Sequence, residues 1–288
     1  MTKDTVKMLR RDAFVIESAS NVKLPCAEPL IISLDGCLSK EFGKGFKKPF
    51  DTVFQHVMTK TLLHLCSAIP GALMWYSYSD KIVLILFQSH DDSGTITSGQ
   101  AYDLPKIISL AASTATLNFN TNFAFAVEAL KNNLPPNSKD VAEYAKRYSP
   151  AYLSRLETKC WRATFTAKAF SVPASKVGGF IKHCQVNSII ASAEAVAEAL
   201  GFTGSEIREA AHIASPNTQW LFQTIKKNWN NYPSAYRLGI FAVKMDIEHQ
   251  CGENNAHIDV SKQQWRVVEN TPNVLDSFKE LNKYLPEI

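Results

Sequence analysis

The pattern of apolar and polar positions predicts a strand and then a helix near the start of the chain. Residues 29–34 (PLIISL) form a short apolar run that ends abruptly at Asp35-Gly36. Such a run is typical of a buried strand, which here delivers Asp35 to a turn. Residues 49–67 repeat apolar side chains near the helical period, and Pro49 suits the first turn of a helix. We therefore expect a strand followed by an amphipathic helix.

A second carboxylate lies at the junction of two further strands. Residues 72–87 (ALMWYSYSDKIVLILF) hold two β-rich runs that meet at Ser79-Asp80, which predicts a hairpin with Asp80 at or beside its turn. Successive side chains on a strand face opposite sides, so we expect Lys81 to point away from any site that Asp80 lines, or along the turn. Asp35 and Asp80 would meet if their strands are neighbours in one sheet.

The rest of the chain predicts alternating helices and strands with one break. The turn-rich stretch 132–138 (NNLPPNS) is the clearest linker and places a break near 131–150. The expected helices cover 101–115, 175–200 and 217–228; the expected strands cover 117–129, 162–172 and three closing segments at 237–249, 257–260 and 264–270. We find no internal repeat in this pattern.

Composition excludes several classes of protein. The chain has 288 residues, 45% hydrophobic and 20% charged, which is enough to bury a core, and no stretch is long and apolar enough to span a membrane. The amino terminus lacks the apolar segment of a secretory signal, so we expect a cytoplasmic protein. Six scattered cysteines without a C-x-x-C pair indicate reduced thiols, and a net charge of +4 permits an anionic partner without requiring one.

Asp35 and Asp80 are the main candidates for chemistry. Two carboxylates a few ångström apart repel each other, and a divalent cation relieves that repulsion. Mg²⁺ takes one or two carboxylates and completes its shell with waters and substrate phosphates, the arrangement that two-metal phosphoryl or nucleotidyl transfer requires. The alternative is that both aspartates are ordinary turn residues.

Other side chains give weaker indications of a site. The histidines show no metal-ligand spacing, and no histidine or asparagine is identifiably placed to activate Cys37 as a nucleophile. Residues 42–50 mix basic and aromatic side chains in a way seen on surfaces that bind single-stranded nucleic acid, although the phenylalanines could instead anchor the loop in the core. The residues concerned are Lys44, Lys47 and Lys48 with Phe42, Phe46 and Phe50.

Several short motifs, in one order over roughly residues 25–272, resemble the tRNA(His) guanylyltransferase family and its reverse-polymerase relatives. They are L-D-G at 34–36, F-K-K-P-F-D at 46–51, Y-S-D at 78–80, T-F-T-A-K-A-F-S-V-P at 164–173, Q-V-N-S at 185–188, N-W-N at 228–230 with Pro233 and Gly239, and W-R-V-V at 265–268.

The resemblance implies an α+β fold with a palm-like domain, akin to template-directed polymerases and nucleotide cyclases, in which helices back an antiparallel sheet. The palm core and the metal-binding aspartates would lie in 22–135, and the remaining strands, long helices and helical additions in 146–288. Members bind two Mg²⁺ ions, activate a tRNA 5′ end with a nucleotide and add a nucleotide in the 3′→5′ direction. Many are homotetramers, so the resemblance implies a homo-oligomer, dimer or tetramer.

Matched residue by residue, the resemblance implies a site for metal and nucleotide. Asp35, Asp80 and the backbone carbonyl of Gly36 match the metal ligands, and the two aspartates would be catalytic. The residues placed by the resemblance near GTP or ATP and its phosphates are Lys48, Lys168, Asn187, Cys37 and Ser79. The implied reaction is Mg²⁺-dependent transfer of a nucleotide to an acceptor such as a tRNA 5′ end.

The chain departs from the family pattern at three places beside this site. Cys37 stands where the family has arginine, Lys81 where it has glutamate, and Thr166 where it has aspartate. Lys168 replaces an arginine and keeps the charge without the bidentate fork. The alternative to an enzyme is therefore a catalytically degraded protein that keeps the fold to bind nucleotide, RNA or a protein partner.

Overall fold

The computed structural model describes most of the chain. The described residues are 23–24, 28–37, 40–69, 72–86, 102–132, 148–207, 216–246, 263–268 and 271. The expected strand at 257–260 and nearly all of the expected linker at 132–138 lie outside them. Within the described part, no helix is both long and apolar enough to cross a membrane.

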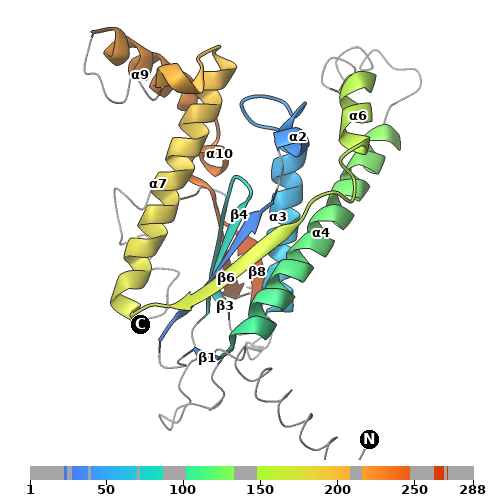
Figure 1. The fold of residues 1–288 in the computed structure, drawn as a ribbon, viewed down its shortest axis with the longest axis vertical. Coiled ribbons are helices and arrows are strands. Elements are labelled where there is room, and N and C mark those ends of the chain that lie inside the picture. Colours follow the sequence, from blue (N-terminus) through green and yellow to red (C-terminus); the bar gives the residue numbers. More distant parts are fainter. Residues whose placement is uncertain are drawn as a thin grey trace, which may run out of the picture.

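A six-stranded antiparallel sheet forms the centre of the fold (Figure 1). Its strand order is β6-β2-β4-β3-β7-β8, so β2, which carries Asp35, and β4, which begins at Lys81, are direct neighbours, which is the condition for Asp35 and Asp80 to meet. The strands are β2 (Leu30–Gly36), β3 (Ala72–Tyr78), β4 (Lys81–Leu86), β6 (Phe165–Ser171), β7 (Ile240–Asp246) and β8 (Gln263–Val267); β1 (Lys23–Leu24) pairs separately with β5 (Tyr102–Asp103).

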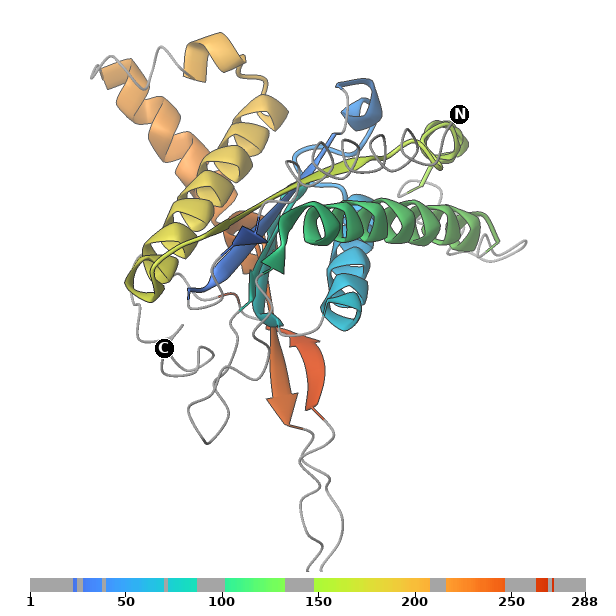
Figure 2. The same ribbon diagram turned by 60° about the horizontal axis from the view of Figure 1, so that its bottom comes forward.

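Helices cover both faces of the sheet, with α3 and α4 on one face and α7 on the other (Figures 1 and 2). Alternate residues of β2 divide between two apolar cores: Leu30 and Ile32 face α3 and α4, while Ile31 faces α7. The helices are α2 (Lys40–Gly43), α3 (Thr52–Ala68), α4 (Leu104–Asn132), α6 (Pro150–Glu157), α7 (Ala174–Ala199), α9 (Pro216–Trp229) and α10 (Ser234–Leu238).

The expected strand at 117–129 is wrong, because these residues continue helix α4. Apolar side chains in this stretch fall on alternate positions and so imitate a strand. The structure buries Phe119, Phe123 and Val127, which are spaced four apart, and leaves Leu117 and Phe125 each 64% exposed. Packing against α3 selects the four-residue spacing, which marks one face of a helix.

Helix α3 begins later than the sequence predicts, because Asp51 rather than Pro49 starts it. The buried Asp51 carboxylate accepts hydrogen bonds from the backbone N–H groups of Val53 (2.9 Å) and Phe54 (3.0 Å) through Oδ1. Its Oδ2 accepts from the Lys47 N–H (2.8 Å) and the Tyr152 hydroxyl (2.7 Å). One side chain thus caps the helix and fixes the preceding loop and α6 against it.

Replacing Asp51 with alanine should lower the free energy of unfolding by about 2 kcal/mol, since it removes a helix cap and leaves the Tyr152 hydroxyl without its acceptor. Urea unfolding measures this loss. Ser149→Ala is the control: Ser149 caps α6 through one longer bond, 3.3 Å from the Tyr152 N–H, and should cost about 0.5–1 kcal/mol. An equal cost for both variants would refute the role given to Asp51.

Candidate functional site

A row of polar side chains crosses the sheet at the ends of four strands. Asp35 on β2 lies opposite Thr166 on β6 and Lys81 on β4, and Lys81 lies opposite Tyr78 on β3. Directly opposed residues of an antiparallel pair share one face of the sheet, so this row lies on the face that α7 covers further along. Asp35 and Thr166 are exposed there.

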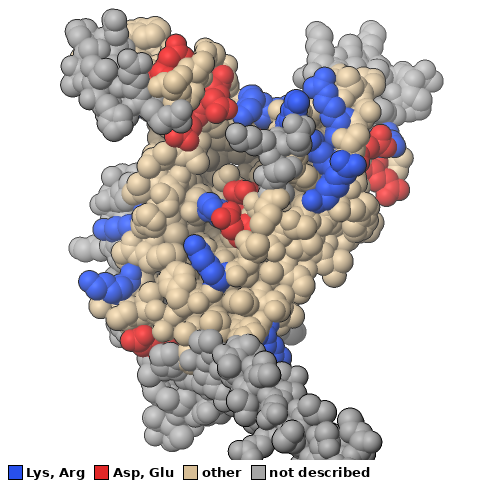
Figure 3. Space-filling model, in the orientation of Figure 1, with Lys and Arg blue, Asp and Glu red and all other residues tan. Residues whose placement is uncertain are grey.

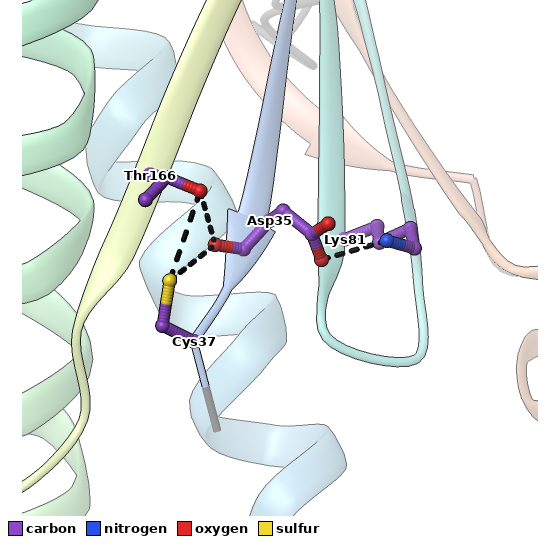
Figure 4. Close-up of polar contacts among 4 residues, drawn as sticks. All are labelled: Asp35, Cys37, Lys81 and Thr166. Carbon is purple, nitrogen blue, oxygen red and sulfur yellow. Dashed lines mark hydrogen bonds and ion pairs between the residues drawn. The ribbon is translucent and has the colours of Figure 1, made fainter. Parts of the chain in front are cut away.

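Lys81 does not point away from the site, contrary to the sequence prediction. Its Nζ lies 2.6 Å from Asp35 Oδ1 in an ion pair that joins β4 to β2 (Figure 4). The expectation applied the alternation of side chains along a strand to Asp80 and Lys81. Asp80 lies in the hairpin turn, as the sequence predicts, so this alternation does not relate the two residues, and the sheet register sets the direction of Lys81.

The hairpin turn brings Asp80 next to the end of β2. The Gly36 N–H donates to the Asp80 carbonyl at 3.0 Å, and Ser79 adopts a positive φ of 50° to close the turn. Burial raises the pKa of the Asp80 carboxyl above its usual range, and the negative charge of Asp35 adds to the rise, whereas Lys81 opposes it. A half-buried carboxylate of this kind gains stability when a cation binds to it.

The oxygen atoms at this corner suit a hard divalent cation. The two carboxylates of Asp35 and Asp80 and the main-chain carbonyl of Gly36 come from adjoining segments. Among the described residues, no three His, Cys, Asp or Glu side chains cluster as metal ligands. A pair of carboxylates with substrate oxygens is the usual set for Mg²⁺, so the donors fit that ion, but the Lys81 ammonium already neutralises one of them.

A cavity of about 360 Å³ opens beside Asp80. Ser79 and Asp80 line one side and residues 42–43 and 46–51 another, while α7 and α10 close it with Ser188 and Tyr236. The Phe50 and Tyr236 rings stack at 5.1 Å between centroids, which makes part of the wall flat and apolar. An apolar cavity of this size with a few polar groups is typical of a small-molecule site.

The other residues singled out from the sequence divide between the cavity and the sheet row. Lys48 lines the cavity, and its exposed ammonium lies 2.9 Å from Glu198 of α7. Lys168 is exposed on β6 opposite Ser33, on the same face as Asp35. Neither Lys168 nor Asn187 nor Cys37 lines the cavity.

Asn187 and Cys37 each make local contacts near the row. The Asn187 amide lies 3.1 Å from His183 Nε2, one turn earlier on α7, and reaches the Tyr78 hydroxyl. Burial raises the pKa of Tyr78 to about 12, so this hydroxyl stays neutral beside the carboxylates. The exposed Cys37 thiol lies 3.7 Å from the Thr166 hydroxyl (Figure 4).

Acidic and basic side chains occupy separate parts of this face. Acidic side chains lie in and above a hollow, and lysine and arginine side chains surround it and gather beside it (Figure 3).

The family model of tRNAHis guanylyltransferase matches residues 13–157, half of the chain. This chain belongs to the tRNAHis guanylyltransferase family.

Solved structures of tRNAHis guanylyltransferases and their relatives share the fold. A bacterial tRNA(His) guanylyltransferase-like protein in complex with ATP is 22% identical, covers 96% of this chain and 99% of its own, and gives a TM-score of 0.68. A bacterial tRNA(His) guanylyltransferase-like protein in complex with GTP is also 22% identical. It covers 96% of this chain and 98% of its own, and gives a TM-score of 0.63. The tRNA(His) guanylyltransferase of Saccharomyces cerevisiae is 17% identical, with coverage of 80% and 91% and a TM-score of 0.56. No curated protein matches the sequence.

Several side chains of this guanylyltransferase family member hold the helices around the cavity, and the sequence alone does not indicate their contacts. The Tyr76 hydroxyl donates to the Leu238 carbonyl at 2.6 Å, and the Gln185 amide donates to the same oxygen at 3.3 Å. Ser192 Oγ accepts from the Trp229 indole at 2.8 Å. Together these bonds hold α7, α9 and α10 around the cavity. The N-W-N motif located the segment but not its partners.

Proposed function

We propose that the chain is a divergent nucleotidyltransferase with a polymerase-like palm, which transfers a nucleotide from ATP or GTP to an acceptor such as a tRNA 5′ end. The observation that carries this proposal is the position of Asp80, which lines a ligand-sized cavity while its backbone is bonded to the strand end that holds Asp35. Relatives of the same fold have been crystallised with ATP and with GTP.

In this proposal some residues would bind the metal and others would bind the phosphates of the nucleotide. Asp35, Asp80 and the Gly36 carbonyl would hold Mg²⁺, which when bound lowers the pKa of an attacking hydroxyl and stabilises a departing pyrophosphate. Lys48 would break its ion pair with Glu198 and bind a triphosphate in the cavity. Breaking this pair costs little free energy because both side chains are exposed. Lys168 would attract phosphate along the open sheet row.

A second candidate is a protein that binds nucleotide, RNA or a protein partner without transfer. The ion pair between Lys81 and Asp35 favours it, because this lysine occupies the carboxylate that a metal would need. The two candidates differ in one measurable property. An enzyme transfers a nucleotide to RNA covalently, whereas a binding protein releases its bound nucleotide unchanged.

Titration calorimetry with ATP and GTP, with Mg²⁺ and then with EDTA, tests the proposal. We expect Mg²⁺ to increase wild-type affinity about tenfold, since it bridges carboxylates and phosphates, and we expect Asp35→Ala and Asp80→Ala to abolish that increase. Glu128→Ala, which removes an exposed acid on α4, should behave as wild type. A wild-type protein that binds neither nucleotide with Mg²⁺ would overturn the proposal, and binding without transfer of α-labelled nucleotide to tRNA would establish the second candidate.

A further inference from the structure

A second cavity, of about 420 Å³, adjoins the first through Phe42, which lines both. We call it the basic pocket; its polar lining consists of Lys44, Arg155, Thr158, Lys159 and Arg162. Among the described residues that line it, four are cations and none is acidic. Lysine and arginine side chains gather at the α6 end of this face, beside the hollow that contains the acidic group (Figure 3).

The fold brings these cations together from two separate segments. The C-terminal end of α6 and the turn after it carry Arg155, Lys159 and Arg162, and the Arg162 N–H donates to the Lys159 carbonyl at 3.2 Å to close that turn. The second segment is the facing loop, which carries Lys44 and in which Gly45 has a φ of +90°. A Cβ at Gly45 would lie 3.0 Å from Arg155 Cδ, so the glycine lets the arginine lie close against the loop.

One cation of the basic pocket is buried rather than solvated. Lys159 is only 7% exposed, and its ammonium lies 5.6 Å from the Phe42 ring centroid and 5.4 Å from that of Phe46. A lysine on an ordinary solvated surface extends into water, whereas this one is kept at the base of the pocket over aromatic faces. Glu157, at the end of α6, forms an ion pair with Lys131.

The lining favours phosphate groups over other ligands. Guanidinium forks on Arg155 and Arg162 match phosphate oxygens, and none of the described lining residues is a carboxylate that would bind a cation. Phe42 is the one aromatic side chain among the described lining residues, so these residues offer no stacking platform for bases. The pocket therefore suits the sugar-phosphate backbone of a strand more than a nucleoside.

We propose that the basic pocket binds the phosphodiester backbone of a single-stranded nucleic-acid segment whose end enters the cavity at Asp80; this rests on the proposed function. Phe42 belongs to both cavities, so a strand held by Arg155 and Arg162 needs only to pass residues 42–48 to reach Asp80. The basic and aromatic residues of that loop, noted in the sequence as a nucleic-acid pattern, would then lie beneath the strand.

The test measures binding of a labelled single-stranded oligoribonucleotide by fluorescence anisotropy over a range of salt concentrations. The double variant Arg155→Gln/Arg162→Gln removes two exposed cations, and we expect about fivefold weaker binding at low salt and a salt-dependence slope smaller by about 1.4, since each neutralised phosphate contributes roughly 0.7. The control Lys60→Gln/Lys106→Gln removes the same charge from exposed positions on α3 and α4. A melting temperature equal to that of the wild type confirms that each variant is folded.

Three outcomes decide the proposal. Weaker RNA binding in the arginine variant alone supports it, and an equal effect in both variants, or none, overturns it. Inorganic tripolyphosphate that competes with the RNA at equal concentration would assign the pocket to free polyphosphate and would also overturn it. ATP and GTP, titrated with Mg²⁺ into wild type and the arginine variant, report separately on the Asp80 cavity. If neither nucleotide binds to either protein while RNA binding still depends on the arginines, the proposed function is refuted and the basic pocket stands.

Discussion

Replacing Lys81 with methionine should increase the affinity of the protein for Mn²⁺ by ten- to a hundredfold. The Lys81 ammonium lies 2.6 Å from Asp35 Oδ1, so a divalent cation must either displace it or bind beside a like charge. Unit charges 4 Å apart interact by roughly 1–4 kcal/mol between water and a protein surface, which sets the size of the effect. Methionine is unbranched and one atom shorter than lysine, and it removes the charge together with the hydrogen bond from Nζ to Asp35.

Mn²⁺ titration followed by electron paramagnetic resonance measures this affinity without any turnover. Lys131→Met is the matched control, because Lys131 forms an ion pair of similar exposure with Glu157 on the far side of the sheet. It should leave Mn²⁺ affinity unchanged. The same weak affinity in wild type and Lys81→Met would show that the ion pair does not compete with a cation, and would remove the main physical argument for the non-catalytic alternative.

Replacing Gly239 with alanine should destabilise the protein by about 4 kcal/mol or prevent folding. Gly239 has a φ of +79°, which costs any other residue about 1–3 kcal/mol. An added Cβ would also lie 2.6 Å from the Tyr76 hydroxyl and 2.7 Å from the Ser77 carbonyl. The tyrosine cannot move aside freely, because its hydroxyl is bonded to the Leu238 carbonyl, so overpacking adds to the backbone strain.

Thermal and urea unfolding test this prediction against a second glycine. Gly179 lies on the exposed side of α7 with no atom within 4 Å of an added Cβ, so Gly179→Ala should leave stability unchanged or raise it by about 0.5–1 kcal/mol. A mild effect of Gly239→Ala would show that β7 and the Tyr76 side chain can shift. The cavity wall at Gly239 would then be softer than the structure indicates.

Much of the secondary structure could be predicted from the sequence, because it depends on short-range patterns. The apolar run before Asp35, the hairpin at Ser79-Asp80 and the helices over 175–200 and 217–228 all appear where periodicity and turn residues place them. The failure at 117–129 has the same origin. A local alternation of apolar residues cannot show that only the four-residue spacing will find a helix to pack against.

The sequence by itself determined most of the strands and helices, the positions of Asp35 near a strand end and Asp80 at a hairpin turn, and the motifs that indicate the family. Only the tertiary structure decided what surrounds those carboxylates. The ion pair with Lys81 depends on the register between β2 and β4, and the basic pocket joins Lys44 to Arg155 across more than a hundred intervening residues. Such contacts are fixed by how strands pair and helices pack, and no local pattern of residues encodes them.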